Sequence, residues 1–236
     1  MATTISSNQN PISNKIKKLL LYCGIVSSLI YVAVLIYLPM QYQGYSSESQ
    51  TISELAAIGS PTIELWYALS LIYCLLIVAF GYGIYLTAKA SRPLQMVAML
   101  MVVLGICSFL LPPMQRRECL AIEGISFTDS LHAMMSFLIG ILMLLTIVFG
   151  AVSFGKYFRY FSIATAFILL VFACMTVLTI PRIVSNMPTP RVGIWERISF
   201  GVYLIWIIVL TILLLLKGDN RENFPDSAKH GLQMWS

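Results

Sequence analysis

Six long apolar stretches alternate with polar connectors along the chain. Apart from Glu64 at the start of the second, none of them contains Asp, Glu, Lys or Arg. About 20 apolar residues are enough for a helix to cross the hydrocarbon core of a bilayer. The pattern therefore predicts six transmembrane helices, over residues 19–38, 63–87, 94–111, 130–150, 161–180 and 198–216.

Prolines follow three of these stretches. Pro39 comes after the first, Pro112 and Pro113 close the third, and Pro181 follows the fifth. Proline lacks a backbone N–H donor, and the residue before it avoids the helical region. We therefore expect the first, third and fifth helices to end at these positions.

Composition settles the class of protein. Hydrophobic residues make up 58% of the 236 residues and charged residues only 11%, whereas soluble domains have roughly 25% charged residues. The predicted fold class is all-α: a polytopic membrane protein with six transmembrane helices in one bundle. We expect a disordered N-terminal tail over residues 1–14, the transmembrane domain over 15–217 and a polar C-terminal tail over 218–236.

Charge is distributed unevenly between the connectors. Ten of the fifteen Lys and Arg residues lie on the side of the two termini and of the turns at 88–93 and 153–160. Seven of the ten acidic residues lie on the other side: six in the longer connectors at 39–62, 112–129 and 181–197, and Glu64 at the start of the second apolar stretch. Cytoplasmic loops are enriched in Lys and Arg, so both termini should be cytoplasmic. The net charge of +5 then reports membrane orientation, and we expect no nucleic-acid partner.

The cysteines indicate neither a disulfide framework nor a metal site. Four of the five lie within apolar stretches, and no Cys-x-x-Cys or zinc-type spacing occurs. Cys119 lies outside them and has no obvious intrachain partner, so it should be a free or an intermolecular thiol. We expect no cofactor and no metal.

The connector after the first helix carries a helix signal. Thr51 and Glu54 have the spacing of a capping box, in which each side chain satisfies a backbone N–H of the other. Gly59 suits a left-handed helix end, and Ser60 with Pro61 suits the start of the next helix. The stretch predicts a short interfacial helix. Glu54 then either only caps this helix or points into the mouth of the bundle.

The fourth helix carries a polar stripe. Asp129 and His132 are three residues apart and share a helix face, and Ser136 and Gly140 continue it. Polar groups at membrane depth face protein or water rather than lipid. His132 either packs as a hydrogen-bonded core residue or serves a site as a proton relay, an anion ligand or a metal ligand.

Charges also mark two other helix ends. Glu196 and Arg197 open the sixth helix and either anchor it at the interface or join a site. The run Arg116-Arg117-Glu118 is either a solvated loop or a group that pairs with these acids or binds phosphate. We predict that the charges meet in one pocket, with His132 between carboxylates and Arg197 facing an acid. The candidate ligand-binding residues are Glu54, Arg116, Asp129, His132, Ser136, Glu196 and Arg197.

Four short motifs carry a resemblance to a known family. They are Tyr45 to Leu55 (Tyr-x4-Gln-x-Ile-Ser-Glu-Leu), Leu111-Pro112, His132, and Gly193 to Arg197 (Gly-x-x-Glu-Arg). Together they resemble the bacterial and archaeal membrane family catalogued as domain of unknown function 998, and more distantly Frag1/DRAM/Sfk1-type six-span proteins. The family pattern has an Asp and a Cys after Leu-Pro; here Cys119 is kept and the Asp is missing. The resemblance implies six spans in a bacterial inner or plasma membrane and supplies no activity.

Three classes of function remain open. The favoured one is binding or transport of a lipid headgroup or small polar ligand, with membrane lipid as a partner, through a pocket on the extracytoplasmic side. The alternative is a structural or assembly protein with interfacial charge anchors. An intramembrane hydrolase would use Asp129, His132 and Ser136, but Ser136 lies about 6 Å of helix rise from His132, which is long for a nucleophile and its base. No nucleotide-binding motif indicates ATP-driven transport, and the sequence leaves the oligomeric state open.

Overall fold

The computed structural model describes residues 11–88 and 91–223, and within these ranges it is helical without strands. Three short helices, the 3-10 helix η1 (Ile52–Ala56), α4 (Arg117–Glu123) and α7 (Ile180–Val184), lie in the connectors. The six long helices are α1 (Pro11–Gln41), α2 (Ile63–Ala88), α3 (Arg92–Phe109), α5 (Phe127–Ala151), α6 (Lys156–Val177) and α8 (Val192–Asn223).

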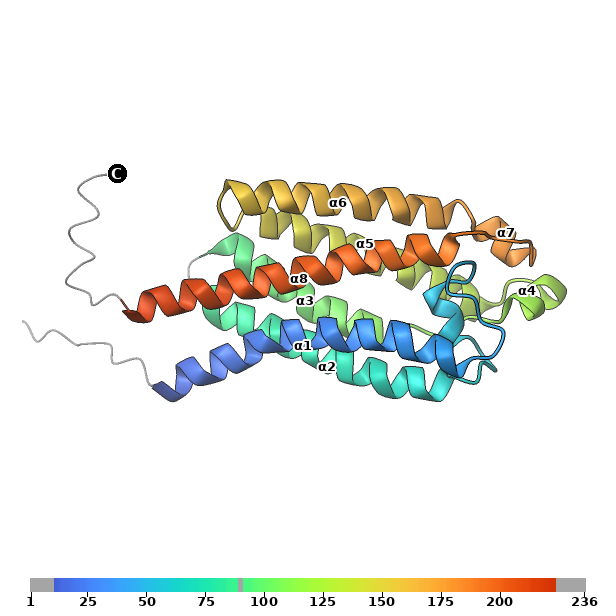
Figure 1. Ribbon diagram of the computed structural model, residues 1–236, viewed down its shortest axis with the longest axis horizontal. Helices are drawn as coiled ribbons and strands as arrows, with labels where there is room; N and C mark the ends of the chain where they lie inside the picture. The colour runs from blue at the N-terminus through green and yellow to red at the C-terminus, as the bar shows by residue number, and fades with distance from the viewer. Residues whose placement is uncertain (1–10, 89–90, 224–236) are drawn as a thin grey trace, which may run out of the picture.

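The six long helices are each long and apolar enough to cross a membrane, which confirms the predicted all-α polytopic bundle. They run up and down, so both described ends of the chain lie at the same end of the bundle (Figure 1). α1 already begins at Pro11 and α8 continues to Asn223, so each takes in part of a predicted tail. The rest of the two tails, residues 1–10 and 224–236, lies outside the described residues.

The long helices form a closed ring. Contacts join α1 to α2, α2 to α3, α3 to α5, α5 to α6, α6 to α8, and α8 back to α1. Tyr203 and Trp206 of α8 are fully buried, and each bonds to another helix. The Trp206 indole donates to Ser162 Oγ at 2.9 Å, and the Tyr203 hydroxyl lies 2.9 Å from Thr146 Oγ1. Tight packing and such interhelical hydrogen bonds hold helices together in lipid, where apolar burial gives little driving force.

The prolines act differently at the three positions. α3 ends at Phe109, shortly before Pro112 and Pro113, as predicted. The prediction for Pro39 is wrong, because α1 continues through it to Gln41. A proline this close to a helix end costs only one of the last backbone bonds. Pro181 follows α6 by four residues and lies in the first turn of α7, where proline fits a helix.

α3 is the shortest of the long helices. It has 18 residues and α2 has 26, which at 1.5 Å per residue makes α3 roughly 12 Å shorter. α2 ends and α3 begins at the end of the bundle where the described chain ends lie, so the difference in length falls at the opposite end. There the chain continues from Leu110 to Arg116 without helical structure.

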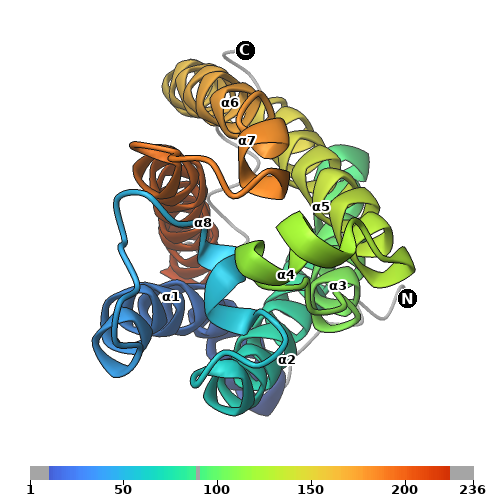
Figure 2. The ribbon, with the colours of Figure 1, turned by 90° about the vertical axis from the view of Figure 1, so that its right-hand side faces the viewer.

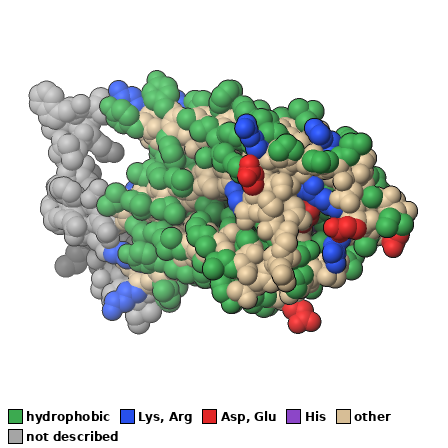
Figure 3. Space-filling view, turned by 45° about the vertical axis from the view of Figure 1, so that its right-hand side comes forward, with side chains coloured by type: hydrophobic (Ala, Val, Ile, Leu, Met, Phe, Trp, Pro, Cys, Tyr) green, Lys and Arg blue, Asp and Glu red, His purple; other side chains and the backbone are tan. Residues whose placement is uncertain are grey.

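The connectors at that end form a cap, which we define as residues 42–62, 110–126 and 178–191. Viewed from this end, η1 and α4 lie across the mouth of the helix ring (Figure 2). In the space-filling view hydrophobic side chains cover the middle of the molecule, and the visible acidic side chains gather at the cap end (Figure 3). The charge bias of the sequence thus corresponds to the two ends of the bundle, while the cytoplasmic location of the termini stays a prediction.

Candidate functional site

Glu54 is the centre of the cap. The predicted capping box is present: Glu54 Oε2 accepts from the backbone N–H of Thr51 at 2.6 Å and from its hydroxyl at 2.9 Å. The carboxylate also accepts two bonds from the guanidinium of Arg117, Nε to Oε1 and Nη2 to Oε2 at 2.8 Å. Glu54 therefore caps η1 and also forms an ion pair with α4.

Arg117 ties the three connectors of the cap together. Its Nη1 donates to Thr189 Oγ1 at 2.6 Å and its Nη2 to the carbonyl of Ser49 at 3.1 Å. The Thr189 hydroxyl donates to the same Ser49 carbonyl at 2.8 Å. One guanidinium thus joins the α1–α2 connector, α4 and the segment before α8. A buried charge needs such full pairing, because an uncompensated one costs several kcal/mol.

Glu196 and Arg197 bind the first connector to the start of α8. The Glu196 carboxylate accepts from the backbone N–H of Ile52, the first residue of η1. Arg197 donates to the carbonyl of Ser47 at 2.8 Å and to the Tyr45 hydroxyl at 2.9 Å. The prediction that Arg197 faces an acid is wrong: its hydrogen bonds go to carbonyls and a phenol.

Gly193 lets this connector approach α8 closely. Its N–H donates to the carbonyl of Glu48 at 2.9 Å. A Cβ at this position would overlap the carbonyl oxygens of Gln50 and Ser47. The Gly-x-x-Glu-Arg start of α8 is therefore the surface against which the backbone of residues 47–52 packs.

Asp129 and His132 hold the segment after α3. Asp129 forms a capping box with Ser126 and also accepts from the backbone N–H of Gln115 at 2.7 Å. The Nδ1 atom of His132 lies 2.7 Å from the carbonyl oxygen of Pro112. Both side chains of the predicted stripe thus fix the non-helical chain that continues from α3.

The predicted single charged pocket is therefore not formed. The charges separate into a Glu54–Arg117 group, a Glu196–Arg197 group, and Asp129 with His132, which bonds to Pro112 rather than standing between carboxylates. Each group bonds to nearby donors or acceptors of the chain, and Glu54 and Arg197 also act electrostatically on Glu196. Whether these residues bind a ligand stays a prediction.

Two further predicted positions lie elsewhere. Arg116 is 43% exposed and pairs with Glu118 at 3.5 Å, so the neighbouring Arg117 takes the buried place. Ser136 is half-buried and does not line the cavity described below.

Ser60 is not the N-cap of the second helix, because its hydroxyl donates to the carbonyl of Leu55 and α2 begins at Ile63. Gly59 does adopt the expected left-handed conformation, with φ of 79°.

A cavity of about 90 Å³ lies beneath the cap, inside the ring of helices. Ser53 and Ala56 of η1 form its roof, and α1, α2, α3, α5 and α8 supply its walls. No Asp, Glu, Lys or Arg lines it. Seven of the nineteen lining residues are aromatic: Tyr31, Trp66, Tyr67, Tyr73, Phe109, Phe200 and Tyr203.

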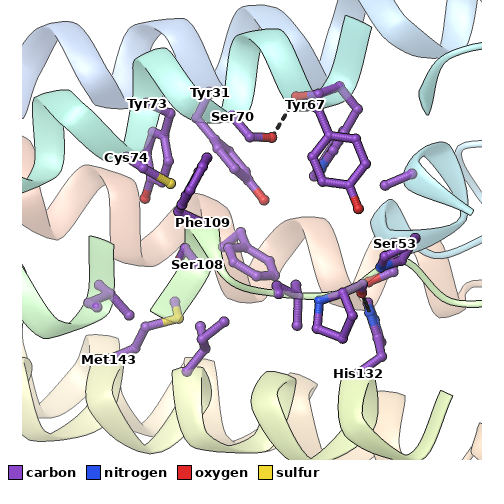
Figure 4. Close-up of a pocket in the computed structure, with 18 of the residues that line it drawn as sticks. Tyr31, Ser53, Tyr67, Ser70, Tyr73, Cys74, Ser108, Phe109, His132 and Met143 are labelled. Atoms are coloured by element: carbon purple, nitrogen blue, oxygen red, sulfur yellow. Dashed lines mark hydrogen bonds between the residues drawn. The ribbon is translucent and has the colours of Figure 1, made fainter. Parts of the chain in front are cut away.

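Several polar groups of this cavity have no hydrogen-bond partner among the described residues. In the close-up, the phenol groups of Tyr31 and Tyr67 point from α1 and α2 into the space that His132 and Ser53 border on the far side (Figure 4). Apart from the exposed Tyr67, the side chains around the cavity leave no fully enclosed unpaired atom, because the one such atom among the described residues that are not exposed is Gln115 Oε1. The unpaired groups are the hydroxyls of Tyr31, Ser53, Tyr67, Tyr73 and Ser108 and the Nε2 atom of His132.

Comparison with known proteins gives one match. Residues 25–213 match the family described as "Protein of unknown function (DUF998)". The chain belongs to the DUF998 family. No curated protein and no solved structure matches it.

The DUF998 match covers both the cap and the cavity. It includes Glu54, Arg117 and Arg197, and it also includes every residue that lines the cavity, from Tyr31 to Tyr203. The predicted resemblance to this family is therefore confirmed, whereas the more distant similarity to Frag1/DRAM/Sfk1-type proteins stays a prediction. The chain is a membrane protein of an uncharacterised family.

The cavity of this DUF998 chain is lined by aromatic, hydroxyl and imidazole groups. No group of three His, Cys, Asp or Glu residues that could hold a metal ion occurs in the described part of the chain. All five cysteines are unpaired, as predicted for Cys119. The cavity offers aromatic faces, hydroxyl donors and an imidazole acceptor, which together suit recognition of an uncharged molecule.

Proposed function

We propose that this DUF998 protein binds a small uncharged amphipathic molecule in the cavity beneath the cap. The observation that carries this proposal is a set of five hydroxyls and one imidazole nitrogen, which belong to residues that line the cavity and have no hydrogen-bond partner in the described chain. Leaving a hydroxyl without a hydrogen bond in apolar surroundings costs roughly 1–3 kcal/mol. Water in the cavity would satisfy these groups, and so would the polar head of a ligand that displaces this water.

The absence of charge in the cavity walls selects the ligand class. No Asp, Glu, Lys or Arg lines the cavity, and the carboxylates of Glu54, Glu196 and Asp129 bond to other groups of the chain. Burying an ionised head without a countercharge costs far more than burying a neutral one. The proposal therefore narrows the lipid headgroup or small polar ligand predicted from the sequence to an uncharged one.

The hydrogen-bond roles follow from His132. The Pro112 carbonyl can only accept, so Nδ1 of the ring carries a hydrogen, and in the neutral ring Nε2 is then an acceptor. Tyr31, Tyr67 and Ser108 can both donate and accept. A ligand head with at least one hydroxyl donor and one oxygen acceptor, such as the glycerol head of a monoacylglycerol, fits this arrangement.

Photolabelling with a monoacylglycerol that carries a diazirine in its acyl chain tests the proposal. The variant Ser108→Phe fills the cavity, and Ile106→Phe places the same side chain on α3 at a position that is 49% exposed and does not line the cavity. We expect labelled peptides from α2, α3 or α5 in the wild type and in Ile106→Phe. In Ser108→Phe the labelling should fall about tenfold or more, which corresponds to ~1.4 kcal/mol of binding free energy.

Equal labelling of all three proteins would contradict the proposal. It would favour the alternative, a structural or assembly protein, which is supported by the number of cap residues whose charges hold connectors in place. A melting temperature measured for each variant shows whether a loss of labelling comes from a loss of folding.

A further inference from the structure

Two cavity residues also face outward. Tyr67 lies in the second turn of α2 and Phe109 is the last residue of α3, and both line the cavity. Their side chains are 36% and 48% exposed, although both belong to segments long and apolar enough to cross a membrane. The cavity wall therefore extends to the outer surface of the bundle at these two residues.

The short length of α3 explains the opening. Beyond Phe109 the chain continues as Leu110–Arg116 without helical structure, and Leu111, Pro112 and Pro113 of this segment line the cavity. Leu110 N donates to Ile106 O of α3 at 3.0 Å. Three bonds tie the rest of the segment to other parts of the chain: Met114 O accepts from Ile58 N, Gln115 N donates to Asp129, and Pro112 O bonds to His132. These three lie at Pro112 or beyond it, so the stretch next to Phe109 is bonded to α3 alone.

The end of the cavity toward the cap is closed by contrast. Ile52, Leu55 and Ala57 around the roof are 2%, 0% and 1% exposed. The ion pair of Glu54 with Arg117 and the bond from Ile52 N to Glu196 fix this roof to α4 and α8. A molecule coming from water would have to break this network, whereas one coming from the side meets only Tyr67 and Phe109.

We infer that the cavity is loaded sideways from the bilayer, and that its occupant is a membrane lipid with a small uncharged, hydroxyl-bearing head. The head enters between Tyr67 and Phe109 and bonds to the cavity hydroxyls and His132, while the chain stays among the lipids. This inference rests on the proposed function, and it adds the source of the ligand and its route.

Proteoliposomes allow the two routes to be compared. One probe is the diazirine monoacylglycerol with a long chain, supplied within the bilayer of the vesicles. The other carries the same glycerol head on a short diazirine acyl chain that keeps it soluble, and it is supplied in the external buffer. For the wild type we expect labelling of cavity residues by the bilayer probe, and labelling by the soluble probe only at a much slower rate.

Variants at the opening sharpen the test. Phe109→Ala removes the ring that narrows the opening, so the bilayer probe should label severalfold faster. Leu110→Ala is the matched control, because Leu110 is 61% exposed and does not line the cavity, and its rate should equal that of the wild type. Tyr67→Ala should act in the same direction as Phe109→Ala.

Two outcomes would overturn the inference, and they differ. If the soluble probe labels the cavity as fast as the bilayer probe and Phe109→Ala leaves both rates unchanged, the ligand enters from water and only the route is wrong. If neither probe labels the cavity of the folded wild type, or if Ser108→Phe does not reduce labelling, the proposed function itself fails.

Discussion

Glu54 and Arg117 form a bidentate ion pair in which only 4% and 9% of the two side chains are exposed. The pair joins η1 to α4 across 63 positions of sequence. Each partner also bonds to backbone or hydroxyl groups of the cap, so both charges are fully compensated. A buried pair of this kind is costly to break, because removal of one partner leaves the other charge alone.

The first prediction concerns this pair. Glu54→Gln keeps the size of the side chain but leaves the Arg117 charge buried without a counterion, and Arg117→Ala leaves Glu54 in the same state. Each variant should lower the free energy of unfolding by about 3–5 kcal/mol. Arg116→Ala is the control, since its pair with Glu118 is exposed and contributes at most ~1 kcal/mol. Denaturant unfolding in detergent micelles measures the three differences, and equal values would show that the buried pair is not structural.

The second prediction concerns Gly193. A methyl group there overlaps the carbonyls of Ser47 and Gln50, so Gly193→Ala should displace the first connector from α8 and lower the melting temperature. Gly201→Ala, on the same helix with no atom near the added Cβ, should instead gain up to about 1 kcal/mol from helix propensity. A melting temperature of Gly193→Ala equal to that of Gly201→Ala would contradict the close approach.

The third prediction separates the two nitrogens of His132. His132→Asn offers an amide donor where Nδ1 bonds to Pro112 but has nothing in place of Nε2. It should keep the melting temperature and lose labelling by the diazirine monoacylglycerol. His132→Ala should lose both. Full labelling of His132→Asn would show that Nε2 takes no part in binding.

The fourth prediction concerns pH. Burial raises the pKa of Tyr45 to about 12 despite the Arg197 hydrogen bond, which lowers it. The folded protein therefore holds this proton more tightly than the unfolded chain, whose tyrosine has its ordinary pKa of ~10. The resulting stability is complete below pH ~10 and is lost as the pH rises toward 12. Tyr45→Phe should remove this part of the alkaline decrease in melting temperature; an unchanged profile would contradict it.

The fifth prediction concerns orientation. In a cysteine-free background, Gln43→Cys and Ser185→Cys lie exposed in the cap and should react with an impermeant maleimide added to intact cells. Gly155→Cys, exposed in the turn between α5 and α6 at the opposite end, should react only after the membrane is permeabilised. The reverse pattern would place the termini outside.

The fold was predictable because its signals are local. Each span is long, apolar and uncharged, and the capping box of Thr51 and Glu54 needs only four consecutive residues. The errors lie at helix ends. Pro39 is tolerated within the last turn of α1. The Ser60 hydroxyl bonds to the carbonyl of Leu55 instead of capping α2. Tertiary contacts determine where such helices begin and end.

The site was predictable only in part. The sequence identified Glu54, His132 and Arg197 as candidate site residues. It could not show whether Arg116 or Arg117 pairs with Glu54, because this depends on the direction in which each side chain leaves the start of α4. The hydroxyls of Tyr31 and Tyr73 carry no sequence signal, since tyrosine is common in membrane helices. Only the packing of α1 and α2 shows that they face one cavity (Figure 4).

The length of α3 also bears on the surrounding bilayer. Its 18 residues rise about 27 Å, slightly less than the ~30 Å hydrocarbon core. A membrane adapts to a short apolar segment by thinning locally. Lipids beside α3 should therefore be compressed on one flank of the protein only. Such a one-sided hydrophobic mismatch brings the lipid headgroups beside α3 closer to the level of Phe109. The headgroup of a lipid at this position is then already at the depth of the cavity, and only a lateral movement separates it from the cavity.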